Sequence, residues 1–438
     1  MCYAIPGKII SISKDGKTAT IQYFDELRNA HIMPYQNWKP ETGNYVYAQG
    51  GVVVGKTTEK EALPILKLWK EKFLELKKVD EELAAQPENL TTLLQNVEAG
   101  NASQFTTKDM LSIIETQDKS GLETIYQTAN HIRKKRLDNA CCVHGIIEFS
   151  NYCSQNCVYC GIRNQNKKIT RYRMREDEIL QAVDYAVNRL GFKALVLQSG
   201  EDPYFTDEIL VSIVNRIREK HGILIFMSIG ERSKECYEKL YGAGAYGALI
   251  RFETGNSKLY TQLRPGKRLE DRLELIRWLK SNGFVLATGF LIGLPGQTKE
   301  DLVNDILLTK SIAPDMYSFG PFIPHPETPL SSASGSQLAE VLKIISLSRF
   351  VDPESKILVT TALETLAPDA KRTGLLAGAN SLMINLTPEK YRKHYDLYPG
   401  KVKSRNKTQD SEHETENEIR ETIKLLESIG RAPTDLGV

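Results

Sequence analysis

The segment Cys153-Ser154-Gln155-Asn156-Cys157-Val158-Tyr159-Cys160-Gly161 places three cysteines within eight residues. It follows Ile146–Phe149, a short run that predicts a β-strand. Three thiolates on one short loop can converge on one metal centre. A four-iron cubane is held by thiolates and ordinarily takes four of them, so three would leave one iron open to an outside ligand.

The other cysteines do not complete a closed metal site. A structural zinc ion prefers a closed tetrahedral set of ligands, and no further Cys-x-x-Cys pair occurs in the chain. Cys141 and Cys142 lie upstream, near the start of the strand. The total of seven cysteines is odd, which argues against a disulfide framework. We therefore expect an iron–sulfur cluster on the loop, with zinc or unligated thiols as the alternatives.

From Gly145 onward, strand-like and helix-like segments alternate. Eight segments predict strands: Ile146–Phe149, Ala194–Gln198, Ile223–Ile229, Tyr246–Phe252, Phe284–Phe290, Met316–Phe319, Ile357–Thr361 and Ser381–Ile384. Between them, helices are predicted over Glu176–Leu190, Asp207–Lys220, Lys234–Tyr241, Leu269–Ser281, Lys299–Ser311 and Gln337–Ser348. Eight strands with helical crossovers over about 240 residues match a parallel (β/α)8 barrel of the TIM type. The fold class is therefore α/β, with an open doubly wound sheet as the alternative.

The first part of the chain has a different pattern. Short extended stretches predict strands over Lys8–Ser13, Thr18–Phe24, Glu26–Ile32 and Tyr45–Gln49. Thr58 and Glu61 then form the sequence signature of a capping box, which predicts that a helix begins there. We expect a small all-β domain with a helix over residues 1–80, a linker over 81–104 and the barrel over 105–438. After Pro399-Gly400, a polar loop is predicted over Lys401–Glu416 and a last helix over Ile419–Ile429.

Composition excludes two classes of partner. The 57 basic and 55 acidic residues leave a formal charge of +2, so the chain has no field of one sign with which to recruit nucleic acid. No apolar run approaches the roughly 18 residues that suggest a membrane-spanning helix. The first residues lack the layout of a secretion signal. We expect a cytoplasmic protein.

The Cys-x3-Cys-x2-Cys spacing at the end of the first barrel strand, with Tyr159 before the last cysteine, resembles the signature of the radical S-adenosylmethionine (SAM) superfamily. The resemblance implies a 4Fe-4S cluster on Cys153, Cys157 and Cys160. It also implies that SAM chelates the open iron. One electron, from a reductant such as ferredoxin or flavodoxin, would then cleave SAM to methionine and a 5′-deoxyadenosyl radical.

The same resemblance assigns SAM contacts to loops that follow the barrel strands, where active sites of such barrels lie. Ser199-Gly200-Glu201 follows the second strand, in the place of a Gly-Gly-Glu element that meets the SAM amino group. Glu253 suits the ribose hydroxyls, and the planar fork of Arg272 suits the methionine carboxylate. The predicted SAM-binding residues are Tyr159, Ser199, Gly200, Glu201, Glu253, Arg272, Gly293 and Leu294, the last two under the adenine.

Several longer stretches resemble the HydE family of FeFe-hydrogenase maturases, from about Phe105 to the C-terminus. They are Gly145–Asn151, Tyr172–Met174, Leu197–Tyr204, Leu263–Pro265, Gly293–Thr298, Gly320–Leu330 and Leu397–Lys401. The family's substrate is a small iron–carbonyl–cyanide cysteine complex. The resemblance therefore implies a substrate carboxylate at Arg251 and a pocket lined by Gln198, Ser199, Thr360, Thr361 and Tyr395.

Two departures from the HydE pattern are visible in the sequence. Phe252 stands where the family commonly has His. No cysteine follows Cys236, which excludes the second cluster that many HydE proteins carry. A methylornithine-synthase-like amino-acid mutase is the alternative enzyme, and a carrier or scaffold for a metallocofactor is the alternative of another class.

The N-terminal stretch Met1-Cys2-Tyr3-Ala4-Ile5-Pro6-Gly7-Lys8 resembles the HypC family, small β-barrel chaperones of NiFe-hydrogenase assembly, over roughly residues 1–80. The resemblance implies removal of the Met and iron binding at Cys2. HypC usually has a histidine where this chain has Gln49, and an amide is a poor substitute for imidazole on iron. Docking of a maturation partner protein is the alternative role for this domain.

Overall fold

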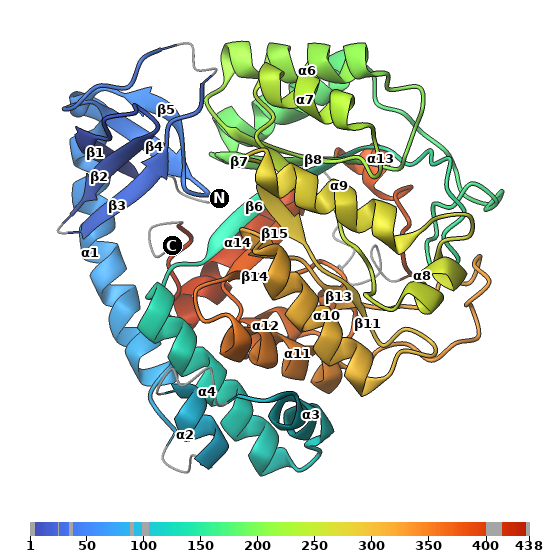
Figure 1. The fold of residues 1–438 in the computed structure, drawn as a ribbon. Helices are drawn as coiled ribbons and strands as arrows, with labels where there is room; N and C mark the ends of the chain where they lie inside the picture. The colour runs from blue at the N-terminus through green and yellow to red at the C-terminus, as the bar shows by residue number, and fades with distance from the viewer. Residues whose placement is uncertain are drawn as a thin grey trace.

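The computed structural model describes residues 5–24, 26–34, 38–87, 92–98, 105–399 and 414–434. Two closed barrels make up most of it (Figure 1). The predicted loop at Lys401–Glu416 falls mostly outside the described residues. Within the described ranges, no helix combines the length and the apolar character that crossing a membrane requires.

Five strands form the small N-terminal barrel in the order β1-β2-β3-β5-β4. They are β1 (Pro6–Ile12), β2 (Thr18–Tyr23), β3 (Glu26–His31), β4 (Tyr45–Gln49) and β5 (Val52–Thr57). β5 is missing from the sequence prediction, because a Gly-Gly pair such as Gly50-Gly51 is also typical of the end of a β region. Both glycines have positive φ, 60° and 73°, and they form the tight turn that connects β4 to β5.

Four helices lead from the small barrel to the large one: α1 (Glu59–Leu83), α2 (Thr92–Glu98), α3 (Thr107–Glu115) and α4 (Lys119–Leu137). The predicted capping box of α1 is present, since Thr58 accepts from the Glu61 N–H and Glu61 accepts from the Thr58 N–H. In Figure 1, α1 runs down one side of the molecule from the small barrel toward α2 and α4. The predicted domain limits at residues 80 and 104 stay a prediction.

The predicted parallel eight-stranded barrel is confirmed, with strand order β10-β12-β14-β15-β6-β7-β8-β9. Its strands are β6 (Cys142–Ser150), β7 (Ala194–Ser199), β8 (Leu224–Ser228), β9 (Gly247–Leu249), β10 (Val285–Thr288), β12 (Met316–Tyr317), β14 (Lys356–Val359) and β15 (Ser381–Asn385). β6 begins four residues earlier than predicted, so Cys142 belongs to it. Every residue of β6 is buried, as expected for a strand covered on both faces.

Helices cover the outside of this barrel (Figure 1). They are α5 (Glu176–Asp184, continued by a π-helical turn over Tyr185–Arg189), α6 (Asp207–Lys220), α7 (Lys234–Ala243), α8 (Ser257–Leu263), α9 (Leu269–Ser281), α10 (Lys299–Ile312), α11 (Leu338–Val351), α12 (Ala370–Leu376), α13 (Glu389–Arg392) and α14 (Glu414–Ser428). A 3₁₀ turn spans Leu363–Thr365, and β11 (Leu291–Ile292) pairs with β13 (Gly320–Pro321) beyond the ends of the barrel strands. α14 begins at Glu414, five residues before the predicted start.

Side chains inside the barrel form layers. Ile146, Val196 and Phe226 lie in register on β6, β7 and β8 and belong to one buried apolar cluster. Two residues further along the same strands, Glu148, Gln198 and Ser228 lie in register. Because strand side chains alternate with a period of two, the apolar layer forms the floor of a polar one.

The small barrel lies against the amino end of the large one. Val52 and Val54 belong to the same buried apolar cluster as Leu224 and Val285 of the large barrel. A Cβ on Gly50 would come within 2.8 Å of the Leu224 side chain. The contact between the two barrels is therefore close and apolar, as in the interior of one domain.

A buried ionic group adds to this contact. Asp80 of α1 accepts two 2.7 Å hydrogen bonds from Arg133 of α4 and a 3.1 Å bond from the Nε of Arg431 near the C-terminus. All three side chains are fully buried. Three segments distant in sequence are thus tied together near the C-terminal end of α1.

Candidate active site

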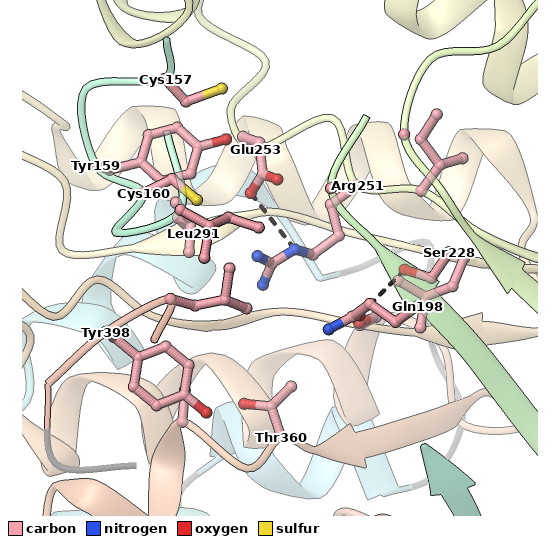
Figure 2. A pocket seen from close by; sticks show the side chains of 18 of the residues that line it. Cys157, Tyr159, Cys160, Gln198, Ser228, Arg251, Glu253, Leu291, Thr360 and Tyr398 are labelled. Atoms are coloured by element: carbon pink, nitrogen blue, oxygen red, sulfur yellow. Dashed lines mark hydrogen bonds and ion pairs between the residues drawn. The ribbon is translucent and has the colours of Figure 1, made fainter. Parts of the chain in front are cut away.

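A cavity of about 270 Å³ opens among the carboxyl ends of the large barrel's strands. Loops that follow β6, β7 and β9 contribute the side chains that line it. The three cysteines of the sequence motif are among them, as are all the predicted substrate residues. Figure 2 shows this cavity, with the cysteine loop on one side and Thr360 and Tyr398 on the other.

The cysteine loop is held by backbone contacts from three directions. The Ser154 N–H donates to the Glu201 carbonyl at 2.9 Å, the Val158 N–H to Leu263 at 2.9 Å, and the Gly161 N–H to Leu397 at 3.0 Å. These bonds fix the loop without using its thiols. None of the described cysteines is in a disulfide.

The surroundings of the thiols disfavour their charged, thiolate form. Burial raises the pKa of Cys153 and of Cys160, and the neighbouring thiols raise the pKa of Cys160 further. Thiolates crowded into a buried loop are unfavourable without positive charge. A bound iron–sulfur cluster would supply that charge, so these three residues fit the group that the motif predicts.

Arg171 was missed by the sequence analysis. Its guanidinium donates to the carbonyls of Asn151, Ile162 and Arg163, which lie on both sides of the cysteine loop. A planar group with several donors can bind several carbonyls at once. Arg171 thus closes the loop at its base, and nothing in a single sequence separates it from its basic neighbours.

Most of the predicted SAM-binding residues lie around the same cavity: Tyr159, Ser199, Gly200, Glu201, Glu253 and Arg272. Glu253 has φ +69°, a strained value for a residue other than glycine. Its Oε2 is buried and makes no hydrogen bond, as is the case for Nε and NH1 of Arg272; Oε2 and the Arg272 Nε have only ion-pair neighbours, at 3.4 Å. Buried polar atoms of this kind are what a polar ligand would satisfy.

Gly293 and Leu294 are not among the residues that line this cavity; Leu291 lines it instead. Their backbone N–H groups donate to the Gln297 side chain at 2.9 and 3.1 Å. Gln297 in turn donates to Asp305 at 3.2 Å. The structure therefore does not bring these two residues together with the others, and their contact with adenine stays a prediction.

Glu231 is a second residue that the sequence analysis missed. Its carboxylate lies 3.0 Å from Arg264, 2.8 Å from Lys267 and 3.4 Å from Arg272. Burial raises the pKa of Glu231, but the charges of Arg272, Arg264 and Lys267 outweigh it and lower the pKa overall. Glu231 therefore stays ionised and holds Arg272 in place through an ion pair.

Arg264 links this group to the strand-end loop after β7. Its second terminal nitrogen lies 3.2 Å from Glu201, and the Glu231 N–H donates to the same Glu201 oxygen at 3.1 Å. Arg264 is nearly fully buried and lines the cavity. The stretch Leu263-Arg264-Pro265 was the sequence signal, but a role for the arginine could not be assigned from it.

The predicted substrate residues Gln198, Arg251, Thr360, Thr361 and Tyr395 all line the cavity. Figure 2 shows the Arg251 side chain extending between Glu253 and Thr360. Its Nε lies 3.4 Å from Glu253 Oε2, and its terminal nitrogens form no hydrogen bond with the described residues. Thr360 Oγ1 is buried without a partner, whereas Thr361 Oγ1 lies 2.8 Å from the Tyr398 hydroxyl.

Glu148 adds a carboxylate that was not predicted. It is buried, it lines the cavity, and its Oε2 accepts from the Asn385 amide at 2.9 Å. β6 is separated from β9, which ends two residues before Arg251, by β7 and β8 in a barrel of eight strands. Glu148 and Arg251 thus lie on different walls of one cavity. No described ion pair joins the two.

Comparison with known protein families agrees with this geometry. The model of the radical SAM superfamily matches residues 147–308, and that of the Biotin and Thiamin Synthesis associated domain matches residues 318–431. The HupF/HypC family model matches residues 1–69. Three family models therefore cover the two barrels.

Individual relatives cover most of the large barrel. The [FeFe] hydrogenase maturase subunit HydE of Thermotoga maritima is 40% identical over 341 residues, which are 78% of this chain and 94% of the relative. The 3-methylornithine synthase of Methanosarcina barkeri is 28% identical over 332 residues, 75% of this chain and 91% of the relative.

Solved structures show the same fold. The crystal structure of methylornithine synthase (PylB) superposes with a TM-score of 0.69 at 27% identity, covering 78% of this chain and 97% of that one. A structure of the FeFe-hydrogenase maturase HydG from Carboxydothermus hydrogenoformans superposes with a TM-score of 0.64 at 17% identity over 83% of each chain. The chain belongs to the radical SAM superfamily and, within it, to the family of the [FeFe] hydrogenase maturase HydE.

Proposed function

We propose that this chain cleaves SAM reductively and directs the radical to a small amino-acid-type substrate, as a step in the assembly of an iron–carbonyl–cyanide metallocofactor. The observation that carries the proposal is one shared cavity. Three thiols, a strained carboxylate, a buried arginine and a second arginine line it together. The 40% identity to HydE supports the link to hydrogenase maturation.

The residues fit the two groups that the family uses. Cys153, Cys157 and Cys160 would hold a 4Fe-4S cluster, Glu253 would accept from the ribose hydroxyls, and Arg272 would bind the SAM carboxylate. When bound, the cluster and SAM together supply one electron and a cleavable carbon–sulfur bond. The protein supplies orientation: Glu231 and Arg264 hold Arg272 and Glu201 at fixed positions.

Arg251 and Glu148 define the substrate class. The terminal N–H groups of Arg251 suit a carboxylate, to which a planar guanidinium can make two parallel bonds. Glu148 suits an ammonium group, because its carboxylate oxygens accept hydrogen bonds from such a donor. A carboxylate and an ammonium held from different walls describe an α-amino acid, and Gln198 and Thr360 add polar contacts between them.

The cavity also keeps water from the reacting atoms. Its floor is the apolar layer that includes Ile146, and Leu291, Phe322 and Met383 contribute apolar walls. A radical abstracts hydrogen from the group nearest to it, so exclusion of solvent and tight positioning of the substrate are what this chain must provide.

The test is production of 5′-deoxyadenosine. The protein is reconstituted with iron and sulfide without oxygen, then given dithionite and SAM. We expect 5′-deoxyadenosine from the native chain and from Cys236→Ser, whose thiol is buried away from the cavity, but none from Cys157→Ser. Equal amounts from the native chain and Cys157→Ser would overturn the proposal.

The mutase alternative is separated by its substrate. The 3-methylornithine synthases are 28% identical to this chain, well below the HydE relative. With L-lysine as the substrate offered, we expect no methylornithine by mass spectrometry. Its formation at the rate of SAM cleavage would replace the maturase assignment with the mutase.

The N-terminal barrel supports a role with a maturation partner, since its family model is that of HupF/HypC. Cys2, the residue predicted to hold iron, lies outside the described residues, and its role stays a prediction. Gln49, in the place of the expected histidine, is fully buried against the large barrel. The edge that carries Gln49 is therefore covered within this chain, so a partner would dock elsewhere on the domain.

A further inference from the structure

A second group of metal-binding side chains lies at the opposite end of β6 from the cysteine loop. Cys142 Sγ is 3.4 Å from His144 Nε2. Both side chains are almost completely buried, with exposed fractions of 0% and 1%. Because they are two residues apart on a strand, they lie on the same face of β6. Neither residue has a part in the SAM site.

The N-terminal barrel meets this pair directly. The amide nitrogen of Gln49, the last residue of β4, donates to Cys142 Sγ at 3.3 Å. Gln49 is fully buried. The sulfur therefore lies between nitrogen atoms of two different barrels.

Three methionines lie in the apolar cluster next to this pair. Ser381 and Met383 of β15 pair in register with Cys142 and His144. Met383, Met316 and Met33 all belong to the buried apolar cluster between the two barrels. Met316 Sδ lies 3.9 Å from the Ser381 hydroxyl, so the side chains of the two strands interlock. Three of the chain's seven methionines are gathered at this junction.

We propose that Cys142 and His144 together bind a soft metal ion at the junction of the two barrels. Metal–thiolate and metal–imidazole bonds of about 2.3 and 2.0 Å at a tetrahedral angle put sulfur and nitrogen roughly 3.5 Å apart. In this structure the two atoms share a hydrogen bond, and their separation of 3.4 Å also matches that of two ligands on one ion. Thiolate, imidazole and thioether are the ligands that soft and borderline transition metals prefer over Mg²⁺ or Ca²⁺.

The pair alone does not make a closed structural site. Among the described residues, no set of three His, Cys, Asp or Glu side chains is close enough to hold a metal, so the pair leaves coordination positions for other ligands. One thiolate neutralises one positive charge. A divalent ion buried here would bring an anionic ligand with it, because an uncompensated charge is costly in an apolar interior.

The proposed metal site lies between the small barrel and the substrate cavity. It lies on the N-terminal side of the apolar layer that floors the substrate cavity, and Met383 contributes both to that layer and to the cavity wall. A metal ion held by Cys142 and His144 would therefore sit between the small barrel and the substrate cavity. This inference stands apart from SAM cleavage and does not depend on it.

The test uses Zn²⁺ and the reconstituted full-length enzyme. Zn²⁺ is titrated against a chromophoric chelator, and X-ray absorption at the zinc edge reports its ligands without interference from the cluster iron. We expect one tightly bound Zn²⁺ per chain with sulfur and nitrogen neighbours. Cys142→Ser and His144→Ala should each weaken binding by about tenfold or more, since even loss of a residue that only orients a ligand costs about 10- to 100-fold at protein metal sites.

Cys141→Ser is the matched control, because Cys141 is the adjacent and equally buried thiol. It should bind Zn²⁺ as the native chain does. Thermal unfolding of each variant shows whether a loss of Zn²⁺ binding comes from loss of the fold. The X-ray absorption spectrum of the native chain reports the zinc ligands directly, without any substitution. A shell of oxygen and nitrogen alone, or equal affinity in Cys142→Ser and Cys141→Ser, would overturn the inference.

Discussion

Arg251 presents its two terminal nitrogens to the cavity while its Nε lies beside Glu253. Arg251→Gln keeps a polar side chain but removes the charge and the two-point geometry. We expect L-cysteine, used as a probe amino acid, to bind the SAM-loaded enzyme about 10- to 100-fold more weakly, since hydrogen bonds to charged groups contribute roughly 1.5–3 kcal/mol. Calorimetry without oxygen measures this, with the half-exposed Arg216→Gln as the control. Equal affinities in both variants would remove Arg251 from the substrate site.

Glu148 calls for a different probe, because its proposed partner is an ammonium group. Glu148→Gln should weaken binding of L-cysteine by about tenfold or more but leave 3-mercaptopropionate, which has the carboxylate and thiol without the amine, almost unchanged. Arg251→Gln should weaken both compounds. If Glu148→Gln weakened both equally, Glu148 would be a structural acceptor for Asn385 and nothing more.

The role of a single residue can be predicted from the sequence when its partners are close to it in the chain. Three cysteines within eight residues indicate one metal centre by their spacing alone. Glu148 and Glu231 give no such signal, because each meets its partners only after distant segments come together. Asn385, for example, is 237 residues from Glu148. Strand alternation could have placed Glu148 toward the barrel interior, but not its role there.

Among the elements, α10 carries a titratable group that contacts the loop after β9 and the loop after β11. Asp305 is fully buried and accepts from the Gly255 N–H and from Gln297. Burial raises the pKa of Asp305 to about 7, and those two hydrogen bonds only partly offset the effect. The folded state therefore holds this proton more tightly than the unfolded chain, where the pKa is that of an ordinary Asp near 3.8.

This difference in pKa sets the direction in which stability changes with pH. Between about pH 4 and pH 7 the unfolded chain loses the proton first, so this group's contribution to the free energy of unfolding falls as pH rises, by roughly 2–4 kcal/mol in all. Asp305→Asn cannot titrate and should lack that fall. Urea unfolding at pH 5 and pH 8 measures the difference between the two proteins. If the free energy of unfolding changed equally in Asp305→Asn and the native chain between pH 5 and pH 8, the raised pKa of Asp305 would be contradicted.

The ends of the strands are harder to predict from the sequence than their presence. The eight strands of the large barrel were predicted in the right order because apolar runs and helical stretches alternate regularly. β5 was missed because a two-residue Gly-Gly hairpin turn needs strands on both sides before it can be recognised. β9 and β12 are shorter than predicted, because residues such as Arg251 and Phe319 lie beyond the barrel ladder.

For the whole molecule, Asp80 ties α1 to α4 and to the C-terminal segment. Asp80→Ala would leave Arg133 and Arg431 buried without their counter-charge. We expect the free energy of unfolding to fall by about 3–5 kcal/mol, the cost of breaking a buried ion pair from one side. Chemical denaturation followed by circular dichroism measures the loss.

The matched control is Glu115→Gln, which breaks the ion pair with Lys299 at 3.0 Å between side chains that are 57% and 51% exposed. Surface pairs contribute about 1 kcal/mol or less, so this variant should unfold almost as the native chain does. A similar loss in both variants would mean that the buried group around Asp80 contributes no more to stability than a surface ion pair.

Two domains could be predicted from the sequence, but not their contact. The β pattern at the start and the alternating pattern after Gly145 each carry a local period. The meeting of Gln49 with Cys142 is set by the shapes of two surfaces that no local pattern describes. The same is true of the cluster that joins Val52 to Leu224.

The small barrel closes off the amino end of the large one and is covalently part of the same chain. Diffusion has no part in bringing the two modules together, and neither can be made in excess of the other. Any group handed from one barrel to the other would stay within one molecule, whatever the concentration of the protein.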